Sequence, residues 1–241
     1  AMLWRFFYVN KKFRRLNLRT NVYIDGYNLF YGCLKHSNDK WLDLYHLFAN
    51  RIIHTQEPNA IVDTVYFFTA DIKSKVSTMG ATAQQAQHAY HRALQTKYPN
   101  HIKIIKGYYA FEKGNMLKYK QPPDKSDRVE VWRLEEKQTD VNIALTAYRD
   151  AIQSKAQQVV FVSNDTDLEP ALRALREDMG DAVTIGVIIP IRKDSRRPKN
   201  QSLSQYADWT RSYITDDELA DSRLPNKVPT KKKPILKPEY W

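Results

Sequence analysis

The stretch QVVFVSNDTDLEP, residues 158 to 170, decides the fold class. Its short apolar run predicts a buried strand. Pro170 lacks an N–H and fits only the first turn of a helix, so a helix over residues 168 to 178 follows the strand directly. Between the two lie Asp165 and Asp167, which either cap that helix or belong to a site at the end of the strand. A strand that leads straight into a helix is the repeating unit of an α/β protein.

The rest of the chain repeats this alternation. Strands are predicted at NVYID (21–25), IVDTVYFFTA (61–70), HIKIIKGYYA (101–110), QVVFVS (158–163) and AVTIGVIIP (182–190). Helices are predicted at LDLYHLFANRII (42–53), ATAQQAQHAYHRAL (81–94), DVNIALTAYRDAIQ (140–153) and LEPALRALRED (168–178). Near-continuous apolar strands that alternate with helices indicate a mostly parallel sheet covered on both faces. The predicted fold class is therefore α/β, a doubly wound and mostly parallel sheet of about five strands.

One predicted helix shows a clear periodicity. Val141, Leu145, Tyr148 and Ile152 recur at spacings of four, three and four, so they form a single apolar face.

Two stretches depart from the strand and helix alternation. Pro122 and Pro123 interrupt a long lysine-rich segment, which we expect to form an excursion at the rim of the sheet with a short extra strand in VEVWRL. The final stretch has four prolines and little to bury, which predicts an extended tail. The predicted organisation is a basic N-terminal extension (1–20), one domain (21–190) containing the lysine-rich excursion (111–138), a basic loop and short helix (191–222, with the helix at 202–213), and a basic Pro- and Lys-rich tail (223–241).

Composition limits the class of protein. A chain of 241 residues with 42% apolar residues can bury a substantial core, which excludes a disordered chain. The single cysteine, Cys33, cannot form an internal disulfide, and no group of Cys and His has zinc-site spacing, so we expect a reducing, cytoplasmic location. No apolar run reaches the roughly 18 residues of a membrane helix, and LWRFFYV is too short for a secretory signal, so we expect no membrane partner.

The net charge of +11 is concentrated at the two ends. Residues 1–20 carry six basic and no acidic side chains, residues 223–241 carry six basic and one acidic, and residues 21–222 balance 26 against 26. Such ends either keep the protein in solution or attract nucleic-acid phosphates, whose released counterions make binding depend strongly on salt.

Acidic residues follow two of the predicted strands and open one helix. Asp25 ends the first strand, with Asn28 three residues on. Asp165 and Asp167 follow the fourth strand, and Asp140 opens the helix before it. Ligands of an open parallel sheet bind at the carboxyl ends of the strands, where strand order reverses, so we expect these acids to gather in one crevice. Neighbouring carboxylates repel, and a hard cation such as Mg²⁺ relieves that repulsion.

Each acid also has a structural interpretation. Asp167 fits as the N-cap of the helix that follows it. Asp140 follows Thr139, a good N-cap, and an acid in the first turn favours the helix dipole. Asp25 precedes a glycine and fits a turn. Asp165 has no such role once Asp167 supplies the cap, so Asp165 has the strongest functional claim.

Three motifs, in this order and spacing, resemble the NYN domain family, a branch of the PIN-like nuclease superfamily. They are VYIDGYNLFYG (22–32), EKQTDVNIALTAYRDA (136–151) and VVFVSNDTDLEPALRALRE (159–177), and the resemblance covers roughly residues 20–190. It implies a Rossmann-like sheet and a metal-dependent ribonuclease, an endoribonuclease, with Mg²⁺ or Mn²⁺ as cofactor. By the same resemblance, Asp25, Asn28, Asp140, Asp165 and Asp167 are catalytic residues, and the four aspartates among them are metal ligands.

Two positions depart from the family pattern. Many relatives have Gly where Asn164 stands, and Asn tolerates the backbone angles that Gly would supply. Relatives often have an Asp where Thr146 stands, so one metal ligand is weakened or the change has no effect.

Further residues are expected to support the site or to bind RNA. Ser163, Asn164 and Thr166 are expected to orient ligands or the scissile phosphate. The residues expected to contact RNA are Lys118, Lys120, Lys125, Arg192, Lys193, Arg196, Arg197 and, by stacking, Tyr31. The expected partner is RNA, either single-stranded or structured such as tRNA, and a homo-oligomer is a further possibility.

Other functions fit the residues less well. A haloacid-dehalogenase motif would need Thr or Val where Glu169 stands, and an EF-hand loop fails because Pro170 occupies its Gly position. His88 and His91 lack a matching carboxylate pattern and are expected at the surface. No Walker or G-x-G-x-x-G loop is present, so no nucleotide cofactor is expected. The serious rival is a catalytically weak or inactive NYN-fold module that binds RNA.

Overall fold

The fold is a seven-stranded sheet with helices on both faces, seen in a computed structural model that describes residues 17–199, 201–239 and 241. The sheet order is β4-β3-β2-β1-β5-β6-β7. Its strands are β1 (Leu18–Asp25), β2 (Ala60–Ala70), β3 (Ile102–Leu117), β4 (Arg128–Lys137), β5 (Gln158–Val162), β6 (Thr184–Ile188) and β7 (Trp209–Arg211). All neighbours pair in parallel except β3 and β4, which are antiparallel.

The mostly parallel α/β class is found, but the prediction of about five strands is too low. The five predicted strands correspond to β1, β2, β3, β5 and β6. β4 is longer than the short extra strand expected in VEVWRL. β7 has three residues, too few for a periodic signal, and lies where a helix over 202–213 was predicted. The prediction of that helix is wrong, because residues 202–213 hold only a short 3₁₀ turn, Ser204–Tyr206, before β7.

Strand order reverses at β1. β2 and β3 extend the sheet on one side of β1, and β5 and β6 extend it on the other. Parallel pairing aligns Ile24 of β1 with Val162 of β5, so the two strands end next to each other. This is the place where ligands bind in open α/β sheets.

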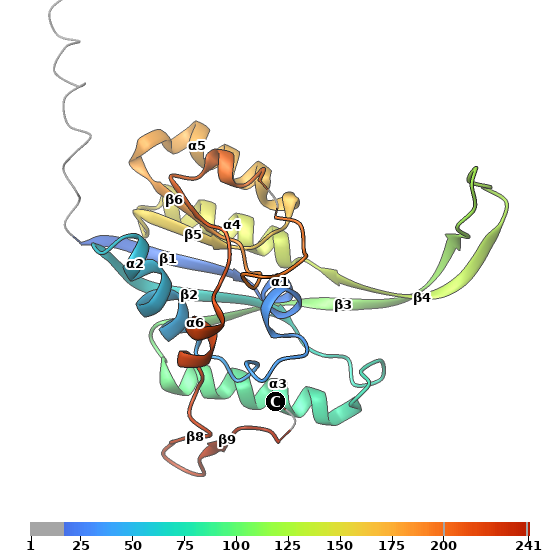
Figure 1. The fold of residues 1–241 in the computed structure, drawn as a ribbon, viewed down its shortest axis with the longest axis horizontal. Helices are drawn as coiled ribbons and strands as arrows, with labels where there is room; N and C mark the ends of the chain where they lie inside the picture. The colour runs from blue at the N-terminus through green and yellow to red at the C-terminus, as the bar shows by residue number, and fades with distance from the viewer. Residues whose placement is uncertain (1–16, 200, 240) are drawn as a thin grey trace, which may run out of the picture.

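Helices cover both faces of the sheet, with α4 and α5 on one side and α3 on the other (Figure 1). The helices are α1 (Gly26–Leu29), α2 (His54–Gln56), α3 (Gly80–Lys97), α4 (Thr139–Ile152), α5 (Glu169–Met179) and α6 (Asp216–Asp221), with π-helical segments at Phe30–Leu34 and His46–Ile53 and 3₁₀ turns at Thr166–Leu168 and Gly180–Ala182. Val22 and Ile24 belong to the α3-side core and Tyr23 to the α4-side core, because successive strand residues point to opposite faces. Among the described residues, no helix combines the length and apolar character needed to cross a membrane.

The apolar face identified by spacing in α4 is the exposed one. Val141 and Leu145 are 61% and 54% exposed, and Ile152 is also exposed. The helix instead buries small residues such as Ala147 and Ala151, which let it approach the sheet closely. Periodicity identified the helix correctly but could not identify which face packs.

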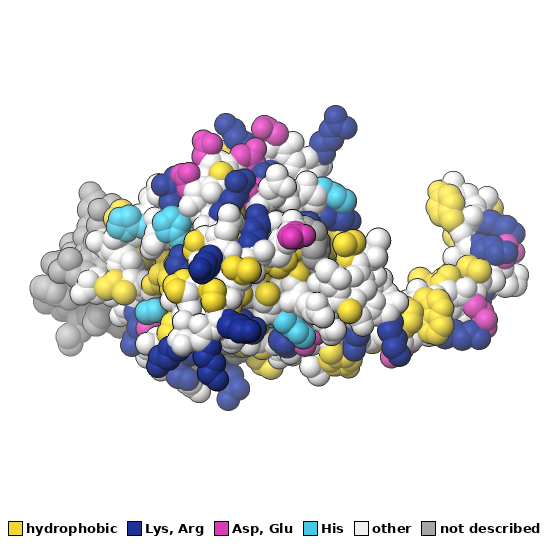
Figure 2. Space-filling view, turned by 90° about the horizontal axis from the view of Figure 1, so that it is seen from below, with side chains coloured by type: hydrophobic (Ala, Val, Ile, Leu, Met, Phe, Trp, Pro, Cys, Tyr) yellow, Lys and Arg dark blue, Asp and Glu magenta, His cyan; other side chains and the backbone are white. Residues whose placement is uncertain are grey.

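The predicted lysine-rich excursion forms a two-stranded arm that projects from the body (Figures 1 and 2). In this arm β3 and β4 pair from Tyr108 opposite Lys137 to Leu117 opposite Arg128. Its faces carry exposed apolar side chains, among them Trp132, which is 70% exposed and stacks on Phe111. The excursion is therefore an ordered extension of the sheet edge, longer than its sequence indicated.

The C-terminal segment is packed on the body, and the prediction of an extended tail with little to bury is wrong. It contains a small antiparallel pair, β8 (Lys227–Val228) and β9 (Ile235–Leu236). Val228 and Ile235 are buried in the α3-side core, and Trp241 packs against Tyr90 with ring centroids 5.1 Å apart. A few well-placed apolar residues anchor a stretch whose average composition is polar.

Candidate metal centre

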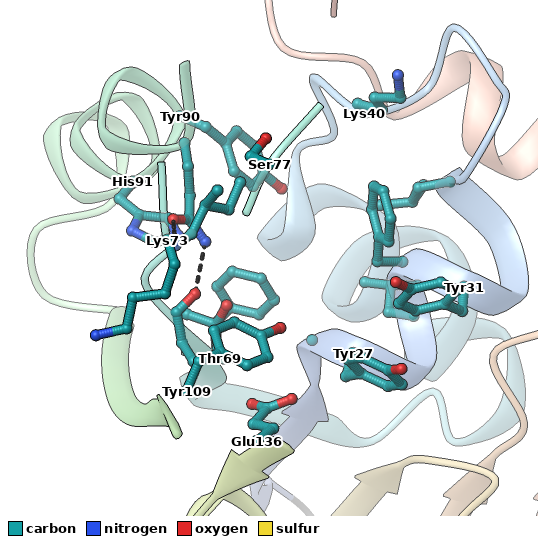
Figure 3. Close-up of a pocket in the computed structure, with 18 of the residues that line it drawn as sticks. Tyr27, Tyr31, Lys40, Thr69, Lys73, Ser77, Tyr90, His91, Tyr109 and Glu136 are labelled. Carbon is teal, nitrogen blue, oxygen red and sulfur yellow. Dashed lines mark hydrogen bonds between the residues drawn. The ribbon is translucent and has the colours of Figure 1, made fainter. Parts of the chain in front are cut away.

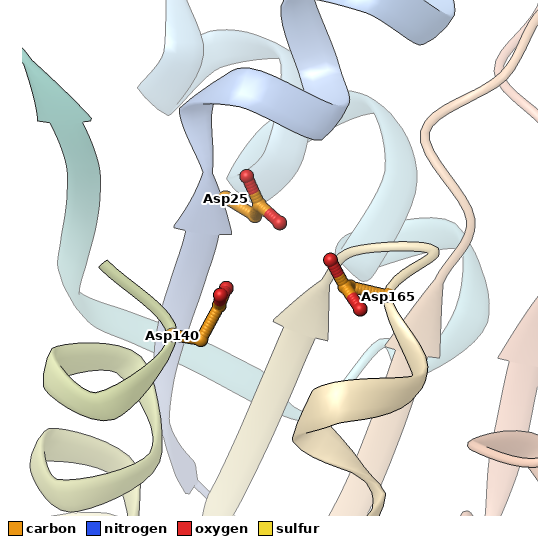
Figure 4. Close-up of side chains that lie close together, drawn as sticks. All are labelled: Asp25, Asp140 and Asp165. Carbon is orange, nitrogen blue, oxygen red and sulfur yellow. The ribbon is translucent and has the colours of Figure 1, made fainter. Parts of the chain in front are cut away.

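Three carboxylates from separate elements converge at the reversal point of the sheet (Figure 4). Asp25 is the last residue of β1, Asp140 lies in the first turn of α4, and Asp165 follows β5. One oxygen from each lies within 4.8 Å of those of the other two. Within the part of the chain that is described, no Lys, Arg or His forms an ion pair with any of them.

Asp25 is fixed by local hydrogen bonds and is only 2% exposed. It caps α1: Oδ1 accepts from the backbone N–H of Asn28 at 2.9 Å, and Oδ2 accepts from the Asn28 side chain at 2.5 Å and from the Ser163 hydroxyl at 2.9 Å. Gly26 permits this turn, because a Cβ there would lie 2.5 Å from the carbonyl oxygen of Phe68. Asn28 and Ser163 thus support Asp25 directly, while the turn role expected for Asp25 also holds.

Asp140 is presented by an unusual helix start. Gln138, not the expected Thr139, occupies the N-cap position, with a left-handed φ of 75°. Few non-glycine residues adopt such a φ, and those that do often lie at functional sites. Thr139 is the first helical residue, and its hydroxyl donates to Glu136 at 2.5 Å. Asp140 follows with its carboxylate toward Asp25 and Asp165 (Figure 4).

Asp165 is both a member of the cluster and a cap, which corrects the sequence argument. Its Oδ1 accepts from the backbone N–H of Asp167 at 3.0 Å and so caps the 3₁₀ turn that leads into α5. The Ser163 hydroxyl also accepts from the Asp165 backbone at 3.1 Å. Asp167, predicted as the cap, is instead exposed and lies outside the group of three. Because Asp165 has this capping role, the inference that it must be functional for lack of a structural role does not hold.

The cluster raises the pKa of its own acids. Burial raises the pKa of Asp25, although the hydrogen bonds from Asn28 and Ser163 oppose this. Burial, followed by the negative charges of Asp25 and Asp165, raises the pKa of Asp140 to about 6. A carboxyl group held among like charges without a basic partner is disposed to bind a proton or a cation.

Glu136 is a neighbour that sequence reasoning missed. It lines a cavity of about 260 Å³ together with the three aspartates, Tyr27 and Tyr109. Burial raises the pKa of Glu136, and the Thr139 hydroxyl opposes that shift. The motif at 136–151 begins at this residue but gave it no role, because Glu136 reaches the site through the antiparallel pairing that places it opposite Tyr109.

The other predicted residues are spread over the molecule. Asn164 donates from its side chain to the Pro198 carbonyl at 3.0 Å, and Thr166 is exposed at the start of the 3₁₀ turn. Tyr31 lines the cavity of the aspartates and contacts Tyr27, with ring centroids 4.4 Å apart. Thr146, at the position of the often-found Asp, is half-buried in α4.

The basic residues expected to bind RNA have mixed environments. Lys118 and Lys120 lie in the arm and pair with Asp127 at 2.8 and 2.6 Å. Arg192 is held by ion pairs to Asp39 and Asp216, a structural role that accounts for its charge. The remaining predicted contacts, Lys125, Lys193, Arg196 and Arg197, are exposed.

The NYN domain model matches residues 19–210 of the sequence. The chain belongs to the NYN domain family. The resemblance seen in the three motifs is thereby confirmed. A curated protein, 6-hydroxy-3-succinoylpyridine 3-monooxygenase HspA of Pseudomonas putida, is 39% identical over 245 residues, which cover 93% of this NYN chain and 75% of that protein. A solved structure of a protein of unknown function from Vibrio parahaemolyticus aligns with a TM-score of 0.49 and 16% identity, over 84% of this chain and 96% of that one.

The donor set of this NYN protein fits a divalent cation. All three donors are carboxylates, the ligands that Mg²⁺ and Mn²⁺ prefer. Asp25 accepts three hydrogen bonds of the roughly four that a carboxylate can accept, so one direction stays open. No hydrogen bond from a described residue reaches Oδ2 of Asp165. Asp25, Asp140 and Asp165 can therefore hold a metal ion, with Asp167 close by.

Proposed function

We propose that this NYN protein is a metal-dependent ribonuclease that hydrolyses phosphodiester bonds within RNA. The observation that carries the proposal is the convergence of Asp25, Asp140 and Asp165, without a basic partner among the described residues, at the reversal point of the sheet. A divalent cation bound there would activate water and offset the charge that develops on the phosphate. Asp25, Asp140 and Asp165 would hold it, and Mg²⁺ or Mn²⁺ suits their oxygen atoms.

The chain's own residues would position these ligands. Ser163 and Asn28 hold the Asp25 carboxylate in one orientation, which keeps an oxygen available for the cation. Asp140, with its raised pKa, must lose its proton before it can serve as a ligand. Tyr27 and Tyr31 lie at the edge of the same cavity, where an RNA base can stack.

The proposal that RNA is the substrate is supported by charge. The basic N-terminal extension and the exposed Lys193, Arg196 and Arg197 offer contacts for phosphates. The arm pairs several of its lysines with acids, so it supports this proposal less than its composition indicated.

Cleavage of labelled RNA by the purified protein tests the proposal. Single-stranded RNA and tRNA are incubated with Mg²⁺ or Mn²⁺, and we expect shortened products that EDTA prevents. Asp165→Asn should lower the rate by roughly 100-fold or more, since one charged contact at the reacting centre is lost. The exposed Asp181→Asn is the matched control and should cleave at the wild-type rate.

Two outcomes would contradict this function. Cleavage that persists in both Asp25→Asn and Asp165→Asn would mean that the activity comes from elsewhere. RNA binding without cleavage in either metal would favour the catalytically inactive RNA-binding module.

One observation favours a second function, the oxygenation of a small heteroaromatic compound. The relative that is 39% identical is named as a monooxygenase of a substituted pyridine. Such a reaction needs dioxygen and a two-electron reductant, and the three carboxylates lack the two histidines typical of non-haem iron oxygenases. The donor set therefore supports hydrolysis better. Substrate-dependent consumption of dioxygen and of a two-electron reductant with 6-hydroxy-3-succinoylpyridine, without RNA cleavage, would establish the second function instead.

A further inference from the structure

A larger cavity adjoins the metal centre (Figure 3). It has a volume of about 420 Å³, within the range of small-molecule sites. It lies between α1 with the segment that follows it, the end of β2, and α3. Tyr27, Tyr31, Tyr109, Leu134 and Glu136 line both this cavity and the one that holds the aspartates. A ligand in the larger cavity would therefore lie next to the carboxylates.

The walls of the cavity carry several aromatic side chains. They include Tyr27, Tyr31, Phe67, Tyr90, Tyr109 and Trp241. In the close-up, Tyr27 and Tyr31 lie on the opposite side of the cavity from His91 and Lys73 (Figure 3). Aromatic faces on several sides favour a flat ring, because stacking and edge-to-face contacts then form together.

The charges around the cavity favour an anion. Lys40 and Lys73 line it, and neither forms an ion pair with a residue that the structure describes. Glu136, on the side shared with the aspartates, is the carboxylate among the described lining residues. In the close-up Lys40 and Lys73 lie on different sides of the cavity (Figure 3), so positive charge that forms no ion pair with a described acid is present at two places along its wall.

His91 adds a polar group to this apolar lining. It was expected at the surface, but it is 6% exposed, and its Nδ1 is buried without a hydrogen-bond partner among the described residues. Burial, with the nearby charge of Lys106, lowers the pKa of His91 to about 4, so the imidazole is neutral at pH 7. An unpaired buried polar atom carries a free-energy cost.

We propose that this cavity binds a planar aromatic ring that carries an anionic group, with the anion at Lys40 or Lys73 and a polar ring substituent at His91. The ring is either the base of a nucleotide, with its phosphate as the anion, or a free heteroaromatic acid. The aromatic walls, the two unpaired lysines and the contact with the metal centre carry this assignment. The binding site goes beyond the hydrolytic function and does not require it.

Binding is measured in EDTA by calorimetry and by tryptophan fluorescence, since Trp241 lines the cavity. The probes are uridine and adenosine monophosphate for the nucleotide, nicotinate for the free acid and nicotinamide as the neutral counterpart of nicotinate. At least one anionic probe should bind, and if nicotinate binds, it should bind more tightly than nicotinamide. The double variant Lys40→Gln/Lys73→Gln should weaken binding by roughly 10-fold or more.

Matched controls separate the cavity from its surroundings. Lys75→Gln, two residues from Lys73, should bind as the wild type does. His91→Phe should weaken binding, whereas His88→Phe, one turn earlier on an exposed part of α3, should not. If His91→Phe fails to fold, the double lysine variant decides alone, because Lys73 is exposed and Lys40 only half-buried.

The outcomes assign the source of the ring. Binding of the nucleotides alone identifies a nucleic-acid base, binding of nicotinate alone identifies a free acid, and binding of both supports the general site. The absence of binding to every probe up to about 10 mM would overturn the proposal, as would unchanged affinity in the double lysine variant. Asp165→Asn should retain ligand binding. If the wild-type protein binds the ligand but cleaves no RNA in either metal, the ribonuclease function fails and this binding site stands.

Discussion

Among the described residues, the Asp25 carboxylate is held by hydrogen-bond donors and not by basic side chains. Each donor therefore contributes to the orientation of this carboxylate. Ser163 donates to its buried carboxylate at 2.9 Å. We expect Ser163→Ala to weaken Mn²⁺ binding by roughly 10- to 100-fold, because a ligand loses the group that orients it. Titration calorimetry measures this. Ser126→Ala is the control, since Ser126 makes a similar bond to Asp124 but on the exposed arm, and equal losses in both variants would contradict the role of Ser163.

The acids of the cluster also predict how stability depends on pH. Asp140 has an ordinary pKa of 3.8 when unfolded and about 6 when folded, so its folded form holds a proton more tightly. The contribution of Asp140 to the stability of the metal-free protein should therefore fall as pH rises from about 4 to 6. Buried His91, whose pKa is lowered to about 4, contributes in the opposite sense over this range, so Asp140 is read from the difference between the wild type and Asp140→Asn. Chemical unfolding of both proteins in EDTA across that range measures this difference. Saturating Mn²⁺ should reverse the trend, since the cation binds the deprotonated form. A difference in stability between the two proteins that stays constant over this range in EDTA would contradict the prediction.

At the scale of the element, α4 shows that a periodic pattern can mark the wrong face. Leu145 belongs to the apolar series yet is exposed, whereas Ala147 is fully buried against the sheet. We expect Leu145→Lys to change the free energy of unfolding by less than about 0.5 kcal/mol. Ala147→Leu should lower it by about 1 to 3 kcal/mol through overpacking. Urea denaturation of the two variants gives the comparison, and the reverse order would mean that the series packs inward.

The site itself was partly predictable because parallel strands end at one edge of a sheet. Asp25 ends β1 and Asp165 follows β5, which pairs in parallel with β1, so the sequence alone placed them together. Asp140 was placed beside them because it opens α4, the helix that precedes β5. Glu136 could not be placed, because its position depends on how far β4 runs back along β3.

At the scale of the whole molecule, contacts between distant segments were beyond the reach of the sequence. Trp241 packs on Tyr90 and lines the larger cavity, although some 150 residues separate them, and nothing local to either marks that contact. The length of the arm, the packing of the C-terminal segment and the shape of the cavity all depend on contacts between residues that are not neighbours in the sequence. The charge pattern, by contrast, can be read locally and yields a prediction for the two basic ends.

The two basic ends should contribute differently to RNA binding. Residues 1–16, which lie outside the described residues, carry five basic and no acidic side chains. Removing them should weaken binding of single-stranded RNA and lower the salt slope of log K by up to about 3.5, at about 0.7 for each lost phosphate contact. Cleavage at saturating RNA should stay the same. Fluorescence anisotropy at several salt concentrations measures the slope.

Removal of residues 223–241 should have another effect. That segment buries Val228 and Ile235 and places Trp241 against Tyr90, so its loss should lower the melting temperature as well as the affinity for RNA. Differential scanning calorimetry of the two truncated chains distinguishes the cases. If the N-terminal truncation left the salt slope unchanged, the positive charge of that end would not contribute to binding, and the phosphate contacts would have to come from the exposed basic residues of the body.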